Sequence, residues 1–419
     1  MAAVFLVLVL APFAWAQAGF YLHPNDTVVF YGDSITDQRL YTTFVETFVV
    51  TRYPSLPVRF VHSGWGGDRV SGGGGGTVDE RLRRDVLAYK PTVMTIMLGM
   101  NDGRYRALEP EIFGEFKVGY EHMLEFLKAA APDLRLTLIQ PSPYDDVTRP
   151  PKFTGGYNAV LVRYGELLKE LAGQRGALAA DLNTSVVDSL RRAYAEDPTL
   201  AEKILADRVH PGPAGHLLMA AALLKAWGAT PTVTRVEIDA SSAHIKQAVN
   251  TAVTGIEKGT GLSWNQKDTV LPMPVWTWLP KKAALASDPV MALAIKSSDF
   301  VQTMNQQILR VTRLAGASYT LKINGSVVGA FSSQQLGEGI NLAEFPTPMA
   351  IQAAGVHALT LRRADLHNTR WRQLQVPFEN EVVPRLQSIL SNIDALDEEL
   401  AARQRASAQP AACFYELIP

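Results

Sequence analysis

Three residues that together could perform acyl transfer stand far apart in this chain. Ser34 follows the apolar run Val28–Tyr31, after a glycine and an aspartate, whereas His210 lies 176 positions later with Asp207 just upstream. A serine hydroxyl becomes a good nucleophile when a base removes its proton, and the imidazole of histidine titrates near neutral pH. An aspartate three residues before the histidine can accept a hydrogen bond from the ring and fix its tautomer. We therefore predict a nucleophile, Ser34, a general base, His210, and an orienting carboxylate, Asp207.

The tetrahedral intermediate of acyl transfer also needs hydrogen-bond donors for its oxyanion. Two further stretches, Gly66-Gly67-Asp68 and Gly99-Met100-Asn101-Asp102, each follow an apolar run. The backbone N–H groups of Ser34 and Gly67 and the side-chain amide of Asn101 can supply these donors. Glycine suits a backbone donor because it has no side chain to block close approach. We therefore predict an oxyanion hole formed by Ser34, Gly67 and Asn101.

Strands and helices alternate through the first half of the chain, and this order is what would bring these residues together. Runs rich in β-branched and aromatic residues predict strands at Val28–Tyr31, Val58–His62, Pro91–Leu98, Leu134–Gln140 and Leu178–Asp181. Amphipathic or apolar segments between them predict helices at Gln38–Tyr53, Thr77–Tyr89, Glu111–Ala131, Tyr157–Arg175 and Leu217–Trp227. Such alternation is typical of a parallel sheet covered on both faces, and ligands bind at the carboxyl edge of such sheets.

Taken in chain order, the stretches that contain these candidate residues resemble the sequence motifs of the GDSL-type, or SGNH, hydrolases. The matching residues are Gly32-Asp33-Ser34, Gly67, Gly99-x-Asn101-Asp102 and Asp207-x-x-His210. The resemblance covers about residues 27–227. It implies an α/β fold, a three-layer flavodoxin-like sandwich with a parallel sheet, and hydrolysis of carboxylic esters through an acyl-serine. The family includes carbohydrate acetylesterases, lipases, lysophospholipases and thioesterases.

Four further residues lie in or beside these motifs and are candidates for supporting the site or contacting substrate. They are Asp33, Asp68, Trp65 and His62. Many members of the family have an asparagine where this chain has His62, for which we expect a structural role, with substrate contact as the alternative. The glycine run Gly72–Gly76 lengthens the loop beside the expected pocket.

Several other kinds of chemistry find no support in the sequence. G-x-S-x-G, H-E-x-x-H and G-x-x-x-x-G-K-[ST] do not occur. Cys413 is the only cysteine, which excludes an intrachain disulfide and a cysteine-based zinc site. We interpret the adjacent acids Asp145 and Asp146 as solvated loop residues, and we predict neither a metal nor a cofactor.

Composition and the N-terminal segment limit the partners and the location. With 40 basic and 41 acidic residues, the chain has no strong field to attract nucleic acid or anionic lipid. Met1–Ala18 is apolar and contains the A-x-A site Ala14-Trp15-Ala16, which predicts a signal peptide cleaved after Ala16 or Ala18. We expect a secreted or periplasmic protein with no stable membrane anchor after cleavage. The sequence does not predict an oligomeric state.

The second half of the chain has a different pattern. We divide the chain into a signal peptide at 1–18, a catalytic domain at 19–230, a mainly β accessory module at 231–349 and a C-terminal helical region at 350–419. Strands are predicted at Val233–Asp239 and Gln307–Val311, with a hairpin of Tyr319–Ile323 and Val327–Phe331 around Asn324-Gly325. Helices are predicted at Ala350–Leu374 and Val382–Arg405, and the tail Phe414–Pro419 as a strand that packs back.

Two roles of this second half remain open from the sequence. The tryptophans of Trp264–Trp278 could stack on sugars or fill a core between domains. The C-terminal helices could form a separate arm or return to cover the pocket.

These features together predict a secreted serine esterase acting on a small-molecule or carbohydrate ester, with acetyl esters of carbohydrates favoured. The alternatives within the family are a lipase or lysophospholipase and a thioesterase. A non-catalytic carbohydrate-binding or adhesion protein is the alternative outside it.

Overall fold

The computed structural model describes residues 19–275 and 288–419. The predicted signal peptide lies outside these ranges, as do Trp276 and Trp278 of the tryptophan-rich segment. Across the described ranges, no helix is both long enough and apolar enough to cross a membrane.

A five-stranded parallel sheet organises the first half of the chain. Its order is β2-β1-β5-β6-β7. The strands are β1 (Thr27–Gly32), β2 (Arg59–Gly64), β5 (Val93–Met97), β6 (Arg135–Ile139) and β7 (Leu178–Ala180), and the two-residue strands β3 (Gly72–Gly73) and β4 (Gly76–Thr77) pair separately. Apart from that small hairpin, the sequential strands take the order 2-1-3-4-5, which is the flavodoxin-like order. The predicted fold class is confirmed.

Neighbouring residues of β1 show which helices cover each face of this sheet. Phe30 packs against Tyr41 of α2 (Leu40–Arg52) and against Trp227, which follows α8 (Pro213–Ala226). Tyr31 points the other way and lies under the guanidinium of Arg81, at 4.9 Å from ring centroid to Cζ. Arg81 belongs to α3 (Val78–Asp85). Because successive side chains of a strand alternate between faces, α2 and α8 cover one face and α3 covers the other. The remaining helices of this half are α1 (Ser34–Asp37), α4 (Pro110–Ala130), α5 (Gly156–Arg175), α6 (Thr184–Glu196) and α7 (Pro198–Ala201).

Two smaller sheets form the β part of the second half. One has the order β15-β12-β8-β9 and the other β10-β11-β16-β13-β14. The strands are β8 (Thr232–Asp239), β9 (His244–Val249), β10 (Thr251–Lys258), β11 (Leu262–Asp268), β12 (Gln306–Thr312), β13 (Ser318–Ile323), β14 (Ser326–Ser332), β15 (Ile340–Asn341) and β16 (Ala412–Ile418). The predicted hairpin is confirmed, and Asn324 and Gly325 at its turn have φ of 50° and 77°.

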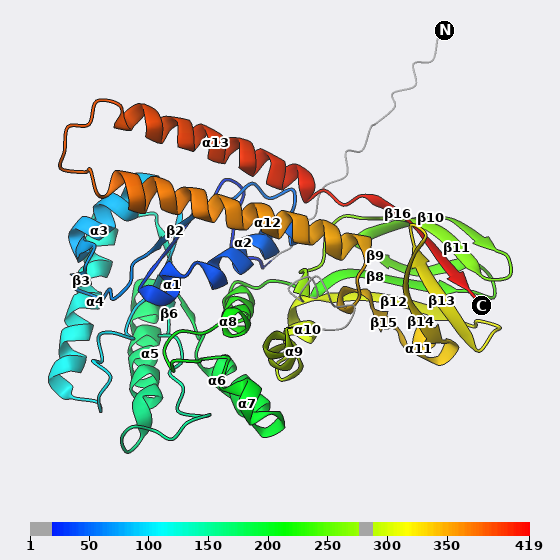
Figure 1. Cartoon of the computed structure of the whole chain (residues 1–419), viewed down its shortest axis with the longest axis horizontal. Helices are drawn as coiled ribbons and strands as arrows, with labels where there is room; N and C mark the ends of the chain where they lie inside the picture. The colour runs from blue at the N-terminus through cyan, green and yellow to red at the C-terminus, as the bar shows by residue number, and fades with distance from the viewer. Residues whose placement is uncertain (1–18, 276–287) are drawn as a thin grey trace, which may run out of the picture.

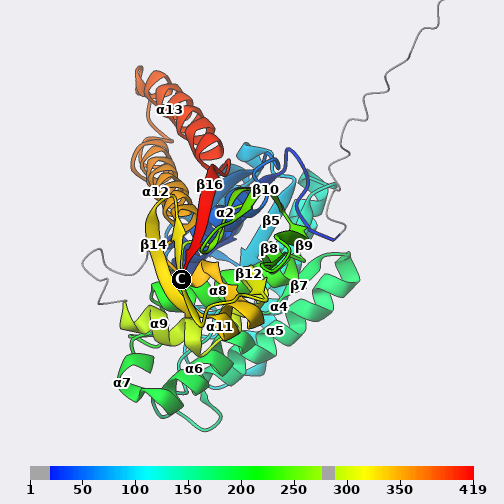
Figure 2. The ribbon, with the colours of Figure 1, turned by 90° about the vertical axis from the view of Figure 1, so that its right-hand side faces the viewer.

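The C-terminal region spans both halves of the molecule. Helices α12 (Pro348–Asn368) and α13 (Leu386–Ser407) lie side by side along the parallel-sheet domain and reach the β sheets (Figures 1 and 2). Helix α12 packs on α2. The predicted final strand is confirmed as β16, which lies between β11 and β13 in the middle of its sheet. Three short helices, α9 (Pro289–Lys296), α10 (Phe300–Met304) and α11 (Ser333–Glu338), complete the second half.

Trp264 belongs to the core of the β sheets. Its side chain is fully buried and stacks on Tyr415 of β16, with ring centroids 5.1 Å apart. A sugar could not stack on this ring. Trp264 fills a core, but that core lies within the β sheets of the second half and not between domains.

Candidate active site

The ends of three adjacent strands bring together the candidate residues from the first half of the chain. Gly32, the last residue of β1, pairs with Gly64 of β2 on one side and with Met97 of β5 on the other. The next few residues after these strand ends include Ser34, Gly67 and Asn101, respectively. Because the strands are parallel and in register, all three loops leave from the same carboxyl edge of the sheet.

Helix α1 begins at the nucleophile candidate itself. Asp33 is the N-cap and accepts a hydrogen bond from the backbone N–H of Ile35 at 3.0 Å. Ser34 is the first residue of the helix, so its hydroxyl is not used as the cap. Burial raises the pKa of Asp33 to about 7, and the nearby carboxylates of Asp102 and Asp68 contribute in the same direction. Asp33 therefore supports the turn that presents Ser34 and faces the protein interior.

The structure places Ser34, His210 and Asp207 in one hydrogen-bonded chain. The distance from His210 Nε2 to Ser34 Oγ is 2.9 Å, and that from His210 Nδ1 to Asp207 Oδ2 is 2.7 Å. The second carboxylate oxygen of Asp207 accepts the backbone N–H groups of Val209 at 2.9 Å and His210 at 2.7 Å. The loop therefore holds the carboxylate through its own backbone, as the three-residue spacing allows.

Electrostatics in this chain favour the protonation state that a general base needs. Burial tends to raise the pKa of Asp207, but hydrogen bonds from the His210 backbone and ring and from Val209 lower it overall. Asp207 is thus a carboxylate at neutral pH and accepts the proton on His210 Nδ1. The lone pair on Nε2 then faces the hydroxyl of Ser34, which is the arrangement for proton removal.

The candidate oxyanion donors lie in loops with fixed geometry. Gly67 has φ of +79°, and a Cβ added there would meet no atom within 4 Å, so its backbone lies open beside the site. The left-handed conformation explains the glycine at this position. Asn101 Nδ2 donates to the carbonyl of Asp68 at 3.0 Å, and its Oδ1 accepts a hydrogen bond from Tyr105 Oη at 3.1 Å. These two bonds fix which end of the amide is the donor, and Nδ2 keeps a second N–H for an oxyanion.

Tyr105 was not predicted as a site residue. It follows the Asn101 loop in a left-handed conformation with φ of +55°, which is uncommon for a tyrosine, and it is 39% exposed. No sequence pattern marks such a conformation, so the only available signal was its closeness to Asn101.

We predict that Tyr105→Phe lowers kcat for p-nitrophenyl acetate about 3- to 10-fold, because the lost bond contributes about 0.5–1.5 kcal/mol to holding the Asn101 amide. Steady-state kinetics would measure this effect. Tyr194→Phe, at a residue that is 37% exposed on α6, is the control and should behave like the wild type. An unchanged kcat for Tyr105→Phe would show that Asn101 needs no such support.

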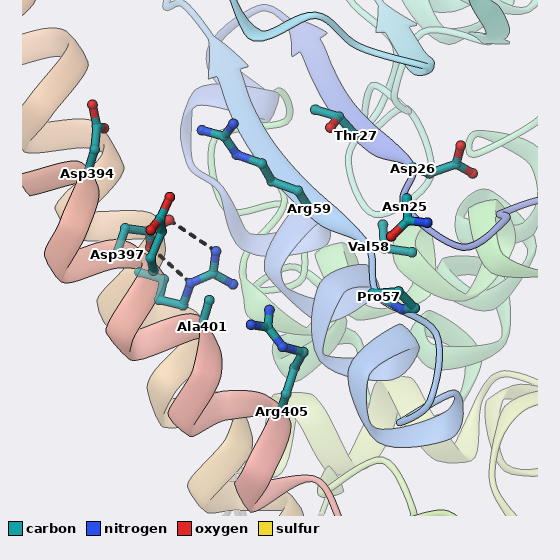
Figure 3. Close-up of a pocket in the computed structure, with 12 residues that line it drawn as sticks. Asn25, Asp26, Thr27, Pro57, Val58, Arg59, Asp394, Asp397, Ala401 and Arg405 are labelled. Atoms are coloured by element: carbon teal, nitrogen blue, oxygen red, sulfur yellow. Dashed lines mark hydrogen bonds and ion pairs between the residues drawn. The ribbon is translucent and has the colours of Figure 1, made fainter. Parts of the chain in front are cut away.

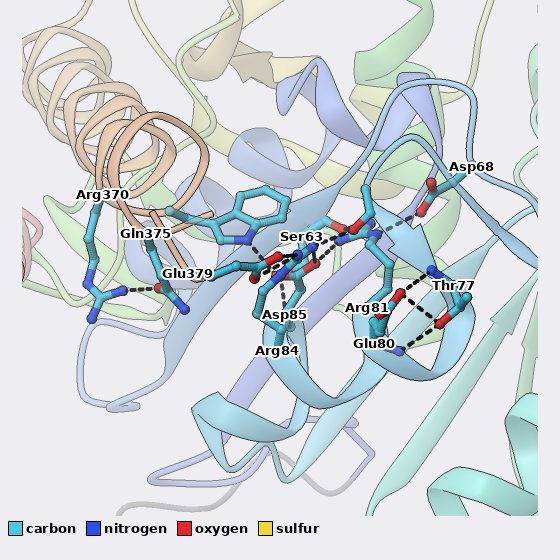
Figure 4. A network of polar contacts seen from close by, with 12 residues as sticks. Ser63, Asp68, Thr77, Glu80, Arg81, Arg84, Asp85, Arg370, Gln375 and Glu379 are labelled. Atoms are coloured by element: carbon cyan, nitrogen blue, oxygen red, sulfur yellow. Dashed lines mark hydrogen bonds and ion pairs between the residues drawn. The ribbon is translucent and has the colours of Figure 1, made fainter. Parts of the chain in front are cut away.

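Asp68 belongs to a polar network under the Gly67 loop, drawn in Figure 4. Arg81 Nε donates to Asp68 Oδ2 at 2.8 Å, and Arg81 also pairs with Asp85. The indole N–H of Trp371, from the C-terminal region, donates to Asp85 Oδ1 at 2.6 Å. All these charged side chains are buried, so the network joins the Gly67 loop, α3 and the C-terminal region.

Trp65 is the aromatic support of the glycine-rich loop. A Cβ at Gly75 would lie 2.5 Å from the indole of Trp65, which explains why a glycine is needed in that part of the run. On another side, Trp65 meets Trp371 edge to face at 5.7 Å between centroids. Trp65 therefore lies between the glycine loop and the C-terminal region.

His62 has a structural position, as expected. It is buried, and its Nδ1 lies 2.8 Å from Thr42 Oγ1 and its Nε2 3.3 Å from Glu46 Oε2, both on α2. The alternative of substrate contact is therefore wrong. The interpretation of Asp145 as a solvated acid is also wrong, because its side chain is 1% exposed and accepts hydrogen bonds from Val147, Thr148 and Arg149.

A cleft of about 670 Å³ opens beside Ser34 and His210. Its lining residues in the described structure are all polar, and they come from the catalytic domain and from the C-terminal region. They are Ser34, Asp37, Gln38, Arg39, Asp207, His210, Asn368, Arg372 and Gln373. The C-terminal region thus returns to the pocket, which decides the question that the sequence left open. Residues 368–373 were not predicted as site residues.

A buried histidine beneath the cleft orients one lining residue. His216 of α8 accepts the backbone N–H of Tyr41 on Nδ1 at 3.2 Å and donates from Nε2 to Gln38 Oε1 at 2.6 Å. Burial lowers the pKa of His216 to about 3, with nearby His210 acting in the same direction, so this histidine remains neutral. It therefore holds Gln38 but does not compete with His210 as a base.

A second cavity, of about 430 Å³, lies away from these residues between α13 and the first residues of β1 and β2 (Figure 3). Charged side chains such as Asp26, Arg59 and Asp394 line it, and its described lining contains no serine or histidine. Within residues 19–275 and 288–419 there is also no group of three or more His, Cys, Asp or Glu side chains placed to hold a metal ion. The cleft beside Ser34 is therefore the candidate active site.

Comparisons with known proteins match the first half of the chain and, in one case, nearly all of it. The sequence model of the GDSL-like Lipase/Acylhydrolase family matches residues 30–218. The chain is similar to an acetylxylan esterase of Geobacillus stearothermophilus, with 27% identity over 225 residues that cover 49% of this chain and 94% of the relative. It is also similar to the solved structure of a gut microbial diltiazem-metabolizing enzyme, with 26% identity and a TM-score of 0.79, covering 95% of this chain and 98% of that one.

Proposed function

We propose that this chain, which belongs to the GDSL-like lipase/acylhydrolase family through residues 30–218 and is a carboxylic ester hydrolase, removes acetyl groups from carbohydrates. In this proposal Ser34 is the nucleophile. The observation that carries this proposal is the hydrogen-bonded chain Ser34–His210–Asp207 at the mouth of a polar cleft.

The reaction proceeds in two halves through an acyl-serine. His210 Nε2 takes the proton of Ser34 as Oγ attacks the ester carbonyl, and Asp207 stabilises the imidazolium that forms. The tetrahedral intermediate collapses as the C–O bond to the alcohol breaks, and His210 gives its proton to the leaving alkoxide oxygen. A water molecule then loses a proton to His210 and attacks the acyl carbonyl. As the C–O bond to Ser34 Oγ breaks, His210 returns that proton to Oγ, which releases the acid and restores Ser34.

The oxyanion of both tetrahedral intermediates is stabilised by the backbone N–H groups of Ser34 and Gly67 and by Asn101 Nδ2. Each such donor contributes about 10²–10³-fold to kcat when it is fixed before the reaction. The hydrogen bonds from Asn101 to the Asp68 carbonyl and from Tyr105 to Asn101 provide this fixation.

The polarity of the cleft supports a short acyl group and a hydroxyl-rich alcohol. A long acyl chain needs an apolar surface, whereas the described lining of this cleft consists of carboxylates, amides, guanidinium groups and the catalytic side chains. The similarity to an acetylxylan esterase supports the same substrate class. The predicted signal peptide at Met1–Ala18 supports action outside the cytoplasm.

A substrate panel on the purified mature chain tests this proposal. We expect acetylated xylobiose and p-nitrophenyl acetate to be hydrolysed, and kcat/KM to fall steeply from acetate to butyrate and palmitate esters. Diltiazem belongs in the panel because the structural neighbour that covers 95% of this chain metabolizes it. The panel also includes an acyl thioester. A preference for palmitate or for the thioester would overturn the proposal in favour of a lipase or a thioesterase.

A further inference from the structure

A π-helical segment at the end of α12 carries residues that face the candidate active site. This segment is Thr369–Gln375, and the N–H of Val376 bonds to the carbonyl of Trp371, five residues earlier, at 3.0 Å. In such a wide turn, residues four and five positions apart lie on one face. Asn368, Arg372 and Gln373 have this spacing, and all three line the cleft. Single π-helical turns of this kind often occur at functional sites.

Trp371 fixes the orientation of this segment. It is 2% exposed and packs against Trp65, with its indole N–H donating to Asp85. Because the tryptophan is anchored in the buried network under the Gly67 loop, the neighbouring Arg372 is held at the cleft (Figure 4 draws the network).

Arg372 is positioned by stacking, and its hydrogen-bond donors remain available. Its guanidinium carbon lies 3.3 Å from the centroid of the Trp65 ring. In the described part of the chain Arg372 forms no hydrogen bond or ion pair, and its Nη1 is buried without a partner. Unpartnered buried donors are uncommon in proteins, because each loses its bonds to water without gaining a replacement. Stacking on the Trp65 ring therefore holds the guanidinium and its N–H donors in place for an acceptor from outside the chain.

The charges around Arg372 indicate a neutral acceptor. Arg39 of the same cleft is paired with Asp365 at 3.3 Å, whereas Asp37 faces the cleft as a carboxylate near Arg372. An anionic ligand would meet Asp37 and Asp207 as well as Arg372. A hydroxyl group can donate to Asp37 and accept from Arg372, so a polyol matches both.

The cleft also lies on the side of the site where the alcohol leaves. His210 must reach the leaving oxygen to protonate it, and His210 and Asp207 both line the cleft. Gly67 and Asn101, the proposed oxyanion donors, are by contrast not among the described residues that line the cleft.

Resting on the proposed function, we propose that the C-terminal segment forms the alcohol subsite, in which Arg372, assisted by Asn368 and Gln373, binds the hydroxyl or ring oxygens of a neutral sugar. The accessory half of the chain thereby takes part in substrate selection, since it supplies one wall of the catalytic cleft.

The test compares Arg372→Ala and Arg372→Lys with the wild type on acetylated xylobiose and p-nitrophenyl acetate. We expect the ratio of kcat/KM for the sugar ester to that for the aryl ester to fall about 10- to 100-fold in Arg372→Ala, mainly through KM, because hydrogen bonds from a charged donor contribute about 1.5–3 kcal/mol. Arg372→Lys keeps the charge but loses the planar fork, so its ratio should lie between the two. Turnover of the aryl ester shows that each variant is folded.

Arg370→Ala is the matched control, because Arg370 is in the same π-helical segment but pairs with Asp394, away from the cleft. Its ratio should equal that of the wild type. The inhibition constant of unacetylated xylobiose against aryl ester hydrolysis gives an independent measurement, and we expect it to rise about 10- to 100-fold in Arg372→Ala.

The outcomes separate this inference from the proposed function. If the wild type hydrolyses acetylated xylobiose but Arg372→Ala leaves the ratio and the inhibition constant unchanged, the alcohol subsite is wrong while the esterase proposal stands. If the wild type hydrolyses the aryl ester but neither hydrolyses the sugar ester nor is inhibited by xylobiose, the carbohydrate proposal fails and the sugar subsite fails with it.

Discussion

Replacing Ser34 with alanine should reduce kcat for p-nitrophenyl acetate about 10⁵–10⁶-fold, the size of effect expected when the nucleophile of a serine hydrolase is removed. The hydroxyl lies 2.9 Å from His210 Nε2 at the carboxyl edge of the sheet, and without it no acyl-enzyme can form. The loss should appear in kcat under single-turnover as well as steady-state conditions. A fluorophosphonate probe should label the wild type and leave Ser34→Ala unlabelled.

The fold should tolerate this substitution, because Asp33 and not Ser34 caps helix α1. Circular dichroism and the urea midpoint of Ser34→Ala should therefore match the wild type. Ser71→Ala, at an exposed serine beside the glycine run, serves as the control and should keep full activity. Substantial turnover by folded Ser34→Ala, or its labelling by the probe, would remove Ser34 from the mechanism.

His210→Ala should cost nearly as much as Ser34→Ala, and the double variant should be little worse than either single variant, because the two residues act as a unit. Asp207→Ala should be milder, with a loss of about 10⁴-fold. Asp207 orients the ring and stabilises its charge, but it does not exchange protons with substrate. A loss for Asp207→Ala equal to that for His210→Ala would contradict this division of roles.

The sequence was sufficient to predict the catalytic half because its signals are local. Each strand of the parallel sheet is a short apolar run, and each candidate residue follows such a run or lies in the loop before α8. Once the strands are parallel, their carboxyl ends must share an edge, so Ser34, Gly67 and Asn101 could be placed together without knowing any distance.

The wall of the cleft formed by the C-terminal segment could not be predicted in this way. Arg372 meets Trp65 through the packing of α12 on α2, which depends on contacts between residues more than 300 positions apart. Its sequence context is an amphipathic helix with several arginines, and no residue there carries a motif. The positive φ of Tyr105 was equally invisible, because it results from the loop around it and not from the tyrosine.

The attachment of this wall depends on a buried ionic cluster between three helices. Arg363 of α12 donates from Nη1 to Glu46 Oε1 of α2 at 2.8 Å, and from Nε to Asp397 Oδ1 of α13 at 2.9 Å. Gln404 of α13 donates to the same oxygen of Glu46 at 3.1 Å, and His62 lies 3.3 Å from the other oxygen. The side chains of Glu46 and Arg363 are 2% and 9% exposed. The cluster therefore ties the helical hairpin to the catalytic domain.

We predict that Arg363→Ala lowers the free energy of unfolding by about 3–5 kcal/mol at pH 7, because it leaves the Glu46 carboxylate buried without its cation. Urea unfolding monitored by tryptophan fluorescence would measure this change. Burial alone would raise the pKa of Glu46, but the Arg363 guanidinium and the bonds from His62 and Gln404 lower it overall. A lowered carboxyl pKa stabilises the fold above the ordinary value of 4.5 and loses this effect as the pH falls through the folded pKa. The difference between Arg363→Ala and the wild type should accordingly shrink as the pH falls below the ordinary value of 4.5.

Two further variants separate the ion pair from simple loss of packing. Arg362→Ala removes the neighbouring exposed arginine of α12 and should change stability by less than about 0.5 kcal/mol. The double variant Glu46→Gln with Arg363→Met removes both charges and fills the space with apolar atoms, so it should recover most of the loss. If the double variant is as unstable as Arg363→Ala, the loss comes from the other polar contacts of Arg363, with Asp397 and Gln404, and not from its pair with Glu46. If Arg363→Ala is as stable as the wild type at pH 7, the hairpin is held by its apolar contacts, and the ionic cluster serves only to fix its position over the cleft.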